Sequence, residues 1–385
     1  MRQQDIVLLS TAEWDNPFWT NKQFVAVELG KLGYRVLYID SLGLRRPSIN
    51  SSDFSRIWKR IKKAFRKPIE VRENIWVWSP ILLPFQRYKF VRGLNHIVLN
   101  GWLNFLIKKL KFKKDIFWTY NPISLDLFNT TEYKQLIYHC VDDIKAQPGM
   151  PIEIIAKSEI ELFKQSDIVF TTSQNLLKSA KKYNSSSYYF SNVADFKHFS
   201  KALNKELKTP DDMQTLPKPI IGFIGAISGY KLDFELINFV ASKRPNYSIV
   251  LIGKVGEGDP WTDINKLKEK NIYLLGAKEY RELPSYLKAI DIAVLPNMLN
   301  EYTKSMFPMK FFEYLSAGKP VVSVKLDALS SFKDVIYLAE DYNDFVCGID
   351  KYLEEYDIKS GLRVAREFTY ESRMKNMMEI VEEKF

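Results

Sequence analysis

Short apolar runs separated by polar, helix-like stretches follow one another along the chain. In the first half, the runs predict strands at 6–10, 35–39, 75–78, 116–120, 136–139, 168–172 and 188–191. Runs that are apolar throughout are typical of parallel strands whose two faces are both covered. Between the first two runs, Val25, Leu29 and Leu32 share one face of a predicted helix that ends at Gly33. This β-α-β pattern repeats, so the first half is predicted to be a doubly wound sheet.

A second series of the same kind follows a polar segment. The segment 201–219 contains Pro210, Pro217 and Pro219, which predicts a linker between domains. The runs after it predict strands at 220–224, 249–252, 272–275, 292–295, 321–324 and 335–338. A chain of 385 residues is long enough for two or three domains. We therefore expect two doubly wound α/β domains, at 1–200 and 220–369.

Charge is distributed unevenly between the two halves. The net charge is +10, yet residues 1–200 hold 30 Lys and Arg against 18 Asp and Glu, whereas the rest hold 26 against 28. The segment 54–114 alone has 16 basic and 2 acidic residues. Composition is otherwise that of an ordinary globular protein, and no nucleic-acid motif accompanies the excess. The sequence therefore predicts a local basic surface and no nucleic-acid partner.

The segment 53–67 has the pattern of an amphipathic interfacial helix. Its apolar residues recur at helical spacing, and basic residues fill the opposite face. Such a helix can bury aromatic rings among lipid headgroups while its cations meet anionic lipid. A second basic cluster spans 108–114. The predicted membrane-contact residues are Phe54, Trp58, Lys59, Arg60, Lys62, Lys63, Phe65 and Arg66. A surface helix with a solvated basic face is the alternative.

The cysteine content and the hydropathy of the chain indicate the cellular compartment in which we expect the protein. The chain has only Cys140 and Cys347, far apart, which excludes a disulfide framework and a structural zinc site. The first ten residues lack a signal-peptide core, and no apolar run is long enough to span a bilayer. We expect a cytoplasmic protein that is peripheral on the inner face of the cytoplasmic membrane.

Two segments of the second half are candidates for phosphate and ribose chemistry. Gly222, Gly225 and Gly229 follow the first strand, where glycines let backbone amides approach phosphate oxygens. Their GxxGxxxG spacing departs from the dinucleotide fingerprint, and an ordinary tight turn is the alternative. The second segment is 306–324, MFPMKFFEYLSAGKPVVSV, where proline and glycine predict the two ends of a helix. On this helix, Lys310 could meet an anion and Glu313 could accept hydrogen bonds from two ribose hydroxyls; an exposed ion pair is the alternative.

Polar residues near the first domain's strand ends are candidates for the acceptor side. His139, Asp142 and Asp143 close the strand at 136–139, at the edge where doubly wound sheets place their sites. Asp15, after the first strand, is comparable. Either Asp142 or Asp143 could orient an acceptor hydroxyl, whereas a helix cap is the alternative role.

The string PMKFFEYLSAGKPVV at 308–322 resembles the donor-nucleotide motif of GT-B glycosyltransferases, particularly retaining family 4 and related enzymes of bacterial surface-polysaccharide synthesis. Looser landmarks occur in that family's order, among them YHCVDD at 138–143, SNVADFKHF at 191–199 and LPSYLKAIDIAVLPN at 283–297. The resemblance implies two Rossmann-like domains facing a central cleft, with a C-terminal helix at about 370–385 crossing back to the first.

The resemblance also implies roles for individual residues. Glu313 would hold the ribose. The backbone amides of Ser305, Met306 and the following residues up to Lys310 would hold the diphosphate, opposite Gly225. Lys231 and Lys254 would neutralise the leaving diphosphate, and His139 would contact the donor sugar. The base would lie near 276–280, which contains Lys278 and Tyr280. The sequence departs from the family at Ser305, where a second Glu is frequent, and in the basic pair usual after the glycine loop.

These features predict transfer of a sugar from a nucleotide diphosphate sugar to a glycan or lipid-linked acceptor, with retention of configuration. A retaining mechanism of the internal-return type needs no general base. No DxD motif is present, so we expect no metal and no cofactor. A nucleotide-sugar epimerase of the same fold and a catalytically silent membrane-associated scaffold are the alternatives.

Overall fold

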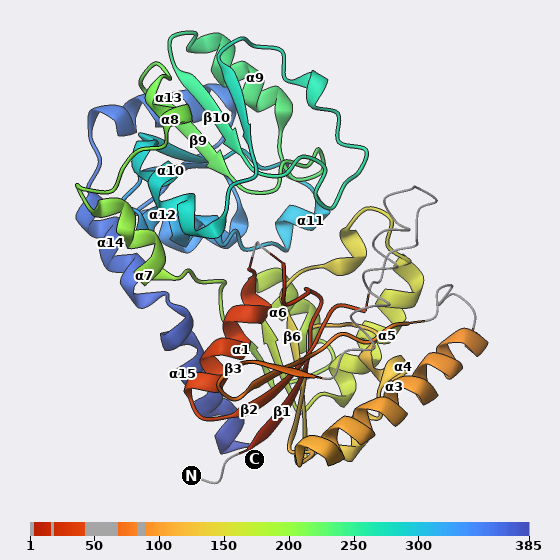
Figure 1. The fold of residues 1–385 in the computed structure, drawn as a ribbon. Helices are drawn as coiled ribbons and strands as arrows, with labels where there is room; N and C mark the ends of the chain where they lie inside the picture. The colour runs from red at the N-terminus through yellow and green to blue at the C-terminus, as the bar shows by residue number, and fades with distance from the viewer. Residues whose placement is uncertain (1–3, 17–18, 43–67, 83–88, 385) are drawn as a thin grey trace. The chain divides into compact units, whose positions relative to one another are not determined.

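The computed structural model describes residues 4–16, 19–42, 68–82 and 89–384. The chain divides into two compact units, and Figure 1 shows the elements of each. Unit 1 comprises Met1–Phe190 together with Met374–Phe385, and unit 2 comprises Ser191–Arg373. Each unit is described by itself below.

Unit 1 is built on a sheet of eight strands in the order β3-β4-β2-β1-β5-β6-β7-β8. Every neighbouring pair is parallel except β3 and β4. The strands are β1 (Asp5–Leu9), β2 (Arg35–Ile39), β3 (Ile69–Arg72), β4 (Ile75–Trp78), β5 (Ile116–Thr119), β6 (Gln135–Cys140), β7 (Ile168–Thr171) and β8 (Ser187–Tyr189). The predicted parallel strands are confirmed, and β3 is an additional edge strand.

Helices cover both faces of this sheet, as the alternation of buried side chains along β1 shows. Ile6 and Leu8 belong to one buried cluster, and Val7 and Leu9 belong to the other. The helices are α1 (Asn21–Lys31), α3 (Lys89–Leu110), α4 (Ser124–Leu127), α5 (Ile152–Gln165), α6 (Gln174–Lys181) and the greater part of α15 (Tyr370–Glu383). Because both faces are covered, strands of unit 1 are apolar throughout rather than alternating.

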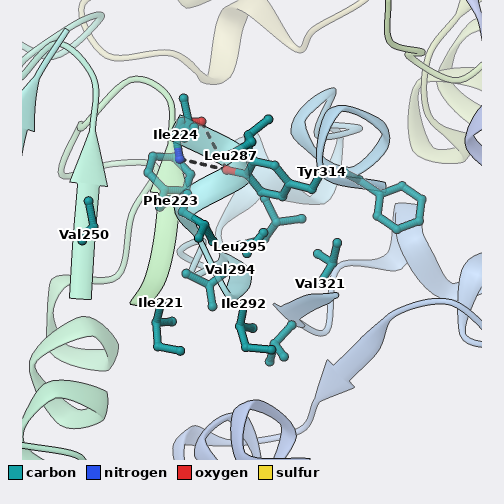
Figure 2. Packing of buried hydrophobic residues seen from close by; sticks show 14 of the residues in the cluster. Ile221, Phe223, Ile224, Val250, Leu287, Ile292, Val294, Leu295, Tyr314 and Val321 are labelled. Atoms are coloured by element: carbon teal, nitrogen blue, oxygen red, sulfur yellow. Dashed lines mark hydrogen bonds between the residues drawn. The ribbon is translucent and has the colours of Figure 1, made fainter. Parts of the chain in front are cut away.

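Unit 2 has a six-stranded, wholly parallel sheet in the order β11-β10-β9-β12-β13-β14. Its strands are β9 (Ile220–Ile224), β10 (Ser248–Ile252), β11 (Ile272–Gly276), β12 (Ile292–Leu295), β13 (Val321–Val324) and β14 (Tyr337–Ala339). Figure 2 shows part of the core around β9 and β12. The strand order reverses between these two strands, which makes their carboxyl ends the topological switch point of unit 2.

The helices of unit 2 precede the first of these strands, lie between the strands or follow the last of them. They are α7 (Phe196–Phe199), α8 (Asp211–Gln214), α9 (Phe234–Lys243), α10 (Leu283–Ala289), α11 (Glu301–Lys304), α12 (Lys310–Ser316), α13 (Tyr342–Glu354) and α14 (Ile358–Glu367). With the strands, they form a doubly wound α/β unit, so the predicted α/β fold class is confirmed in both units.

The segment 201–219 belongs to unit 2 in the structure. It contains α8, and the side chains of Ala202 and Met213 are buried in the core of unit 2. The change from unit 1 to unit 2 falls between Phe190 and Ser191, upstream of the segment predicted to be a linker.

None of the helices in the described ranges is long and apolar enough to cross a membrane. The predicted amphipathic helix at 53–67 lies outside the described residues, and with it all eight predicted membrane-contact residues.

Candidate functional site

The loop between β9 and α9 is fixed at the switch point of unit 2 by the chain that follows β12. The amide of Asp233 donates to the carbonyl of Pro296 (2.9 Å), and the amide of Met298 donates to the carbonyl of Lys231 (2.9 Å). The side chain of Asn297 donates to the same Lys231 carbonyl at 3.2 Å. This loop carries Gly225 and Lys231, so both predicted residues sit where open α/β sheets bind ligands.

Three glycines bring backbone segments together at the ends of β9, β10 and β11. The amide of Gly225 donates to Ile252 (2.8 Å), and that of Gly253 donates to Gly276 (2.9 Å). A Cβ atom on Gly253 would lie 1.7 Å from the carbonyl oxygen of Gly225. A Cβ atom on Gly225 would lie 1.9 Å from Cε of Lys310. At Gly253 the short contact is with backbone, so only glycine fits there, whereas at Gly225 it shows that the Lys310 side chain lies directly against the loop backbone.

The predicted helix of the 306–324 segment is confirmed as α12. It follows Pro308, and it ends before Gly318, which has a φ of 69°. The Tyr314 hydroxyl accepts from the Ile224 amide at 2.9 Å and also contacts the Ile224 carbonyl, as Figure 2 shows. Phe311 and Phe312 are buried in the core of unit 2. These contacts attach α12 to the end of β9, which places Lys310 and Glu313 beside the glycine loop.

Charges of both signs converge around Lys310. Burial lowers the pKa of its amine, and the nearby Lys231 lowers it further, while Glu313 and Glu257 oppose both effects. Burial likewise raises the pKa of the Glu313 carboxyl, against the opposing effect of Lys310. The amine of Lys231 lies over the rings of Tyr230 (5.2 Å) and Tyr302 (5.4 Å). Two cations and a carboxylate, on the loop after β9 and on α12, fit a ligand with an anionic part and a neighbouring hydroxylated part.

The other donor-site candidates have varied surroundings. Lys254 is exposed after β10, and its carbonyl accepts from the Ile227 amide. The amides of Ser305 and Met306 donate to the carbonyls of Tyr302 and Thr303 in α11. Lys278 forms an ion pair with Asp212 of α8 at 2.7 Å. Its amine therefore points toward α8 rather than toward Lys310.

Tyr280 lies close to the Glu313 side of the site. Its ring stacks on that of His198 with a centroid separation of 4.0 Å. Burial raises the pKa of the Tyr280 hydroxyl far above its usual range, and the charges of Asp195 and Glu313 contribute to this rise. Structure therefore brings together Gly225, Lys231, Tyr280, Lys310 and Glu313 within unit 2.

Glu257 and Tyr302 were not identified from the sequence, although Glu257 acts on Lys310 and Tyr302 contacts Lys231. The glycines on both sides of Glu257 were an available signal, because glycine-flanked loops after parallel strands bind ligands. Nothing local marks Tyr302, which meets Lys231 only in the folded unit.

In unit 1, His139 is buried within β6. Its ring stacks on Tyr120 at a centroid separation of 4.8 Å and packs near Trp118 and Phe170. The amine of Lys22 lies 5.8 Å from the centre of the Tyr120 ring, and the same amine pairs with Asp142. His139 is thus part of an aromatic layer beneath the end of the strand.

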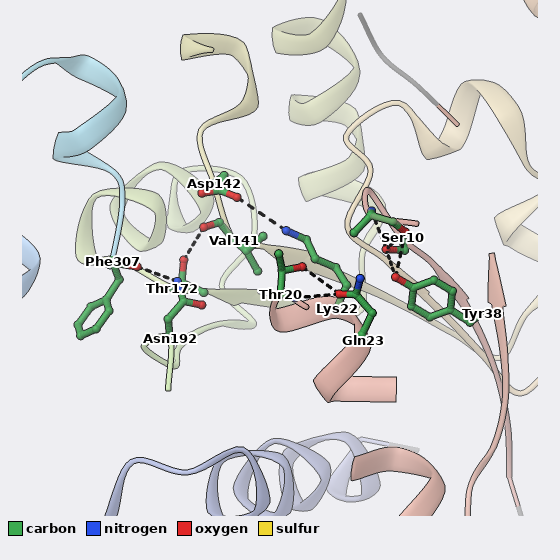
Figure 3. Close-up of polar contacts among 11 residues, drawn as sticks. Ser10, Thr20, Lys22, Gln23, Tyr38, Val141, Asp142, Thr172, Asn192 and Phe307 are labelled. Atoms are coloured by element: carbon green, nitrogen blue, oxygen red, sulfur yellow. Dashed lines mark hydrogen bonds and ion pairs between the residues drawn. The ribbon is translucent and has the colours of Figure 1, made fainter. Parts of the chain in front are cut away.

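The two aspartates after β6 have different partners. The Asp142 carboxylate lies 3.8 Å from the amine of Lys22, which belongs to α1 and is largely buried (Figure 3). Asp143 forms an ion pair with Lys145 at 2.9 Å, and Lys145 also contacts the buried Glu159. Asp15 is exposed in the turn after β1. Lys22, at the start of α1, was not identified from the sequence as a residue of this site.

Within the described ranges, no group of three or more His, Cys, Asp or Glu side chains is arranged to hold a metal ion.

The two Rossmann-like units define the class of the protein as the GT-B fold. The structure resembles sucrose-phosphate synthase from Thermosynechococcus elongatus, with a TM-score of 0.70 and 15% identity over 99% of both chains. It also resembles HepE from Anabaena in complex with UDP and glucose, with a TM-score of 0.67 and 15% identity over 99% of this chain and all of the other. The GT-B fold predicted from the sequence is confirmed.

The family model of glycosyl transferases group 1 matches residues 218–355. The chain is also 27% identical over 237 residues to TuaH of Bacillus subtilis (strain 168), which is assigned to teichuronic acid biosynthesis as a glycosyltransferase. That match covers 57% of this chain and 59% of the relative. The matched residues lie wholly within unit 2, and they include Gly225, Lys231, Lys310 and Glu313.

Proposed function

We propose that the protein is a glycosyltransferase that moves a hexose-type sugar from a nucleotide diphosphate sugar to a hydroxyl of a glycan or lipid-linked acceptor. The observation that carries the proposal is the convergence of Lys231, Lys310 and Glu313 around Gly225 at the switch point of unit 2. The match to a relative assigned to teichuronic acid biosynthesis supports a role in cell-surface polysaccharide synthesis.

In this proposal the diphosphate lies against Gly225, between the amines of Lys231 and Lys310. A bound dianion offsets the repulsion between the two amines and raises the pKa of Lys310, which burial lowers. When the bond between the anomeric carbon and the diphosphate breaks, negative charge grows on the leaving oxygen. Fixed cations at that oxygen stabilise this transition state more than the bound donor. No metal or cofactor has a part in this mechanism.

Glu313 holds the ribose. An ionised carboxylate can accept hydrogen bonds from two neighbouring hydroxyls, and each such bond favours the charged form that burial disfavours. Ribose binding therefore lowers the raised pKa of Glu313. Tyr280 is an aromatic candidate for contact with the nucleotide base, because the charge of Glu313 acts on its phenol.

The acceptor side belongs to unit 1 in the proposal. Asp142, which Lys22 orients, aligns the acceptor hydroxyl. His139, which is buried beneath this end of β6, supports it through the aromatic layer. Transfer proceeds with retention, so the new bond to the anomeric carbon forms on the face that the diphosphate leaves. The acceptor proton passes to the departing phosphate oxygen. Asp143 supports this end of β6 through Lys145.

We further propose that the protein works at the inner face of the cytoplasmic membrane, where a lipid-linked acceptor would be presented. The basic segment 54–114 supports this location, because its cations suit anionic lipid.

Substitution Glu313→Ala tests the donor site. We expect nucleotide affinity to fall by about tenfold or more, because two hydrogen bonds to a charged acceptor are lost. Calorimetric titration with UDP, GDP, ADP and TDP in a buffer with EDTA measures this effect and identifies the base. Glu269→Ala is the matched control, because Glu269 is exposed in the turn before β11. Equal affinity of wild type and Glu313→Ala would contradict the ribose role, and a wild type that binds none of the four would contradict the function.

A further inference from the structure

Helix α3 exposes a continuous apolar face on the outside of unit 1. Five large side chains on it are half exposed or more: Phe90 (75%), Ile97 (68%), Val98 (48%), Trp102 (52%) and Phe105 (55%). Steps of three, four and seven residues relate them, so they share one side of the helix. We call these five side chains the α3 face; Figure 1 shows α3 in orange.

The opposite side of α3 is already buried. Leu99, Leu103 and Leu106 are in the core of unit 1. The Asn100 side chain donates to the carbonyl of Leu127 in α4 and accepts from the amide of Asn129. These contacts fix the rotation of the helix, so the α3 face cannot turn inward. A helix that is apolar on both sides is expected to be covered on both, and an exposed patch of this kind marks an interaction surface.

The charges around the α3 face indicate what covers it. Residues 89–114 contain seven Lys or Arg and no Asp or Glu. At the carboxyl end of the helix, Lys108 and Lys109 are exposed, and the Lys109 amine lies 5.8 Å from the centre of the Phe105 ring. The rings of Trp102 and Phe105 meet edge to face. Exposed aromatic rings beside lysines are the composition of a helix that lies in the headgroup layer of an anionic bilayer.

We propose that the α3 face docks unit 1 onto an anionic lipid bilayer, with the helix lying in the plane of the headgroups. The apolar side chains enter the acyl boundary, and the lysines contact the lipid phosphates. A second copy of the chain fits this surface less well, because two such faces would bring like charges together. The proposal rests on the membrane location proposed above and names the surface that would make it, and it does not depend on sugar transfer. It concerns a helix separate from the segment 53–67.

Matched substitutions in the full-length protein test this proposal. Trp102→Glu places a carboxylate in the centre of the α3 face, and Ile152→Glu does the same at a residue of α5 that is 61% exposed. The probe is co-sedimentation with phosphatidylcholine vesicles that contain about 30% phosphatidylglycerol, at moderate salt. We expect Trp102→Glu to weaken vesicle binding by about tenfold or more, and Ile152→Glu to leave it within about twofold of wild type. Far-UV circular dichroism of both variants, which reports the helices of unit 1 as well as those of unit 2, serves as the check on folding.

A charge-neutralising variant tests the electrostatic part without touching the apolar side chains. Lys108→Gln with Lys109→Gln is expected to reduce the preference for anionic over pure phosphatidylcholine vesicles by about tenfold. Equal vesicle binding of the two glutamate variants overturns the proposal, as does equal binding of wild type to the two kinds of vesicle. A dimer that Trp102→Glu dissociates would assign the face to a second copy. A melting temperature that falls in Trp102→Glu and not in Ile152→Glu would assign the α3 face to another segment of the same chain. Either result also overturns the proposal.

Discussion

The amine of Lys310 lies in a place that disfavours its charged form, because burial and Lys231 both lower its pKa below the usual 10.5. In the free protein this amine therefore loses its proton at a lower pH than an ordinary lysine does. An anion bound beside the amine favours the protonated form and raises its pKa again.

Nucleotide binding should therefore take up protons in the pH range between the lowered pKa of Lys310 and 10.5. Affinity for the cognate nucleoside diphosphate should fall as the pH rises through this range, by up to about tenfold per pH unit. Calorimetry in two buffers of different ionisation enthalpy measures the uptake. In Lys310→Gln the affinity should be lower and the uptake reduced; an unchanged uptake would assign it to another group.

For single residues, a pair that is close in the sequence is easier to predict than a contact between two loops that are far apart in it. Lys310 and Glu313 were predicted because they lie three positions apart on one helix. The effect of Glu257 on Lys310 and the contact of Tyr302 with Lys231 arise only when loops after different strands meet. The pairing of Lys278 with Asp212 joins residues 66 positions apart, so neighbouring residues carry no trace of it.

Among the elements, the crossing of the loops after β9 and β10 places the strictest requirement on a side chain. A methyl group on Gly253 would overlap the Gly225 carbonyl, which rigid backbone on both sides keeps in place. Gly253→Ala should therefore lower the free energy of unfolding of unit 2 by about 3 kcal/mol or more, and should also displace Gly225 and weaken nucleotide binding.

Gly229→Ala is the control for this prediction. It lies in the loop after β9, which also carries Gly225, and the nearest neighbour of an added Cβ would be the Asp259 carboxylate at an ordinary 3.6 Å. Its effect on stability should stay within about 0.5 kcal/mol. Urea denaturation of both variants measures the difference, and equal midpoints would mean that the crossing relaxes freely.

The elements also show why some strands were predictable and one was not. Strands such as β9 and β12 are buried on both faces, so they are continuous apolar runs that a sequence displays directly. The edge strand β3 is largely exposed and carries Glu70 and Arg72, so it lacks such a run. The prolines of 201–219 suggested a linker, although apolar side chains of this segment are buried in unit 2.

At the scale of the whole molecule, each unit has its own core, and unit 1 draws part of its core from the end of α15. Met374, Met377, Met378 and Val381 are buried against β1 and α1. Met377→Ala should lower the stability of unit 1 by about 2–5 kcal/mol, because it leaves a cavity in a closed core. Stabilisation of unit 2 by a nucleoside diphosphate should be unchanged.

Thermal unfolding with and without nucleotide, followed by proteolysis of each unit, separates the two effects. Leu32→Ala serves as the comparison, because it truncates a side chain of unit 1 that is about half exposed, and it should change stability by less than about 1 kcal/mol. If Met377→Ala weakens nucleotide binding as much as it lowers the stability of unit 1, the two cores are not independent.

The nesting of unit 2 within the chain of unit 1 has a consequence for biosynthesis. A ribosome makes the chain from its amino end, and domains generally fold as they emerge. All of unit 2 is translated before α15, so the nucleotide site can form on the ribosome while unit 1 still lacks its last methionines. During that interval the incomplete face of unit 1 offers exposed apolar surface to chaperones. Unit 1 is therefore expected to complete its core after unit 2, although its chain begins first.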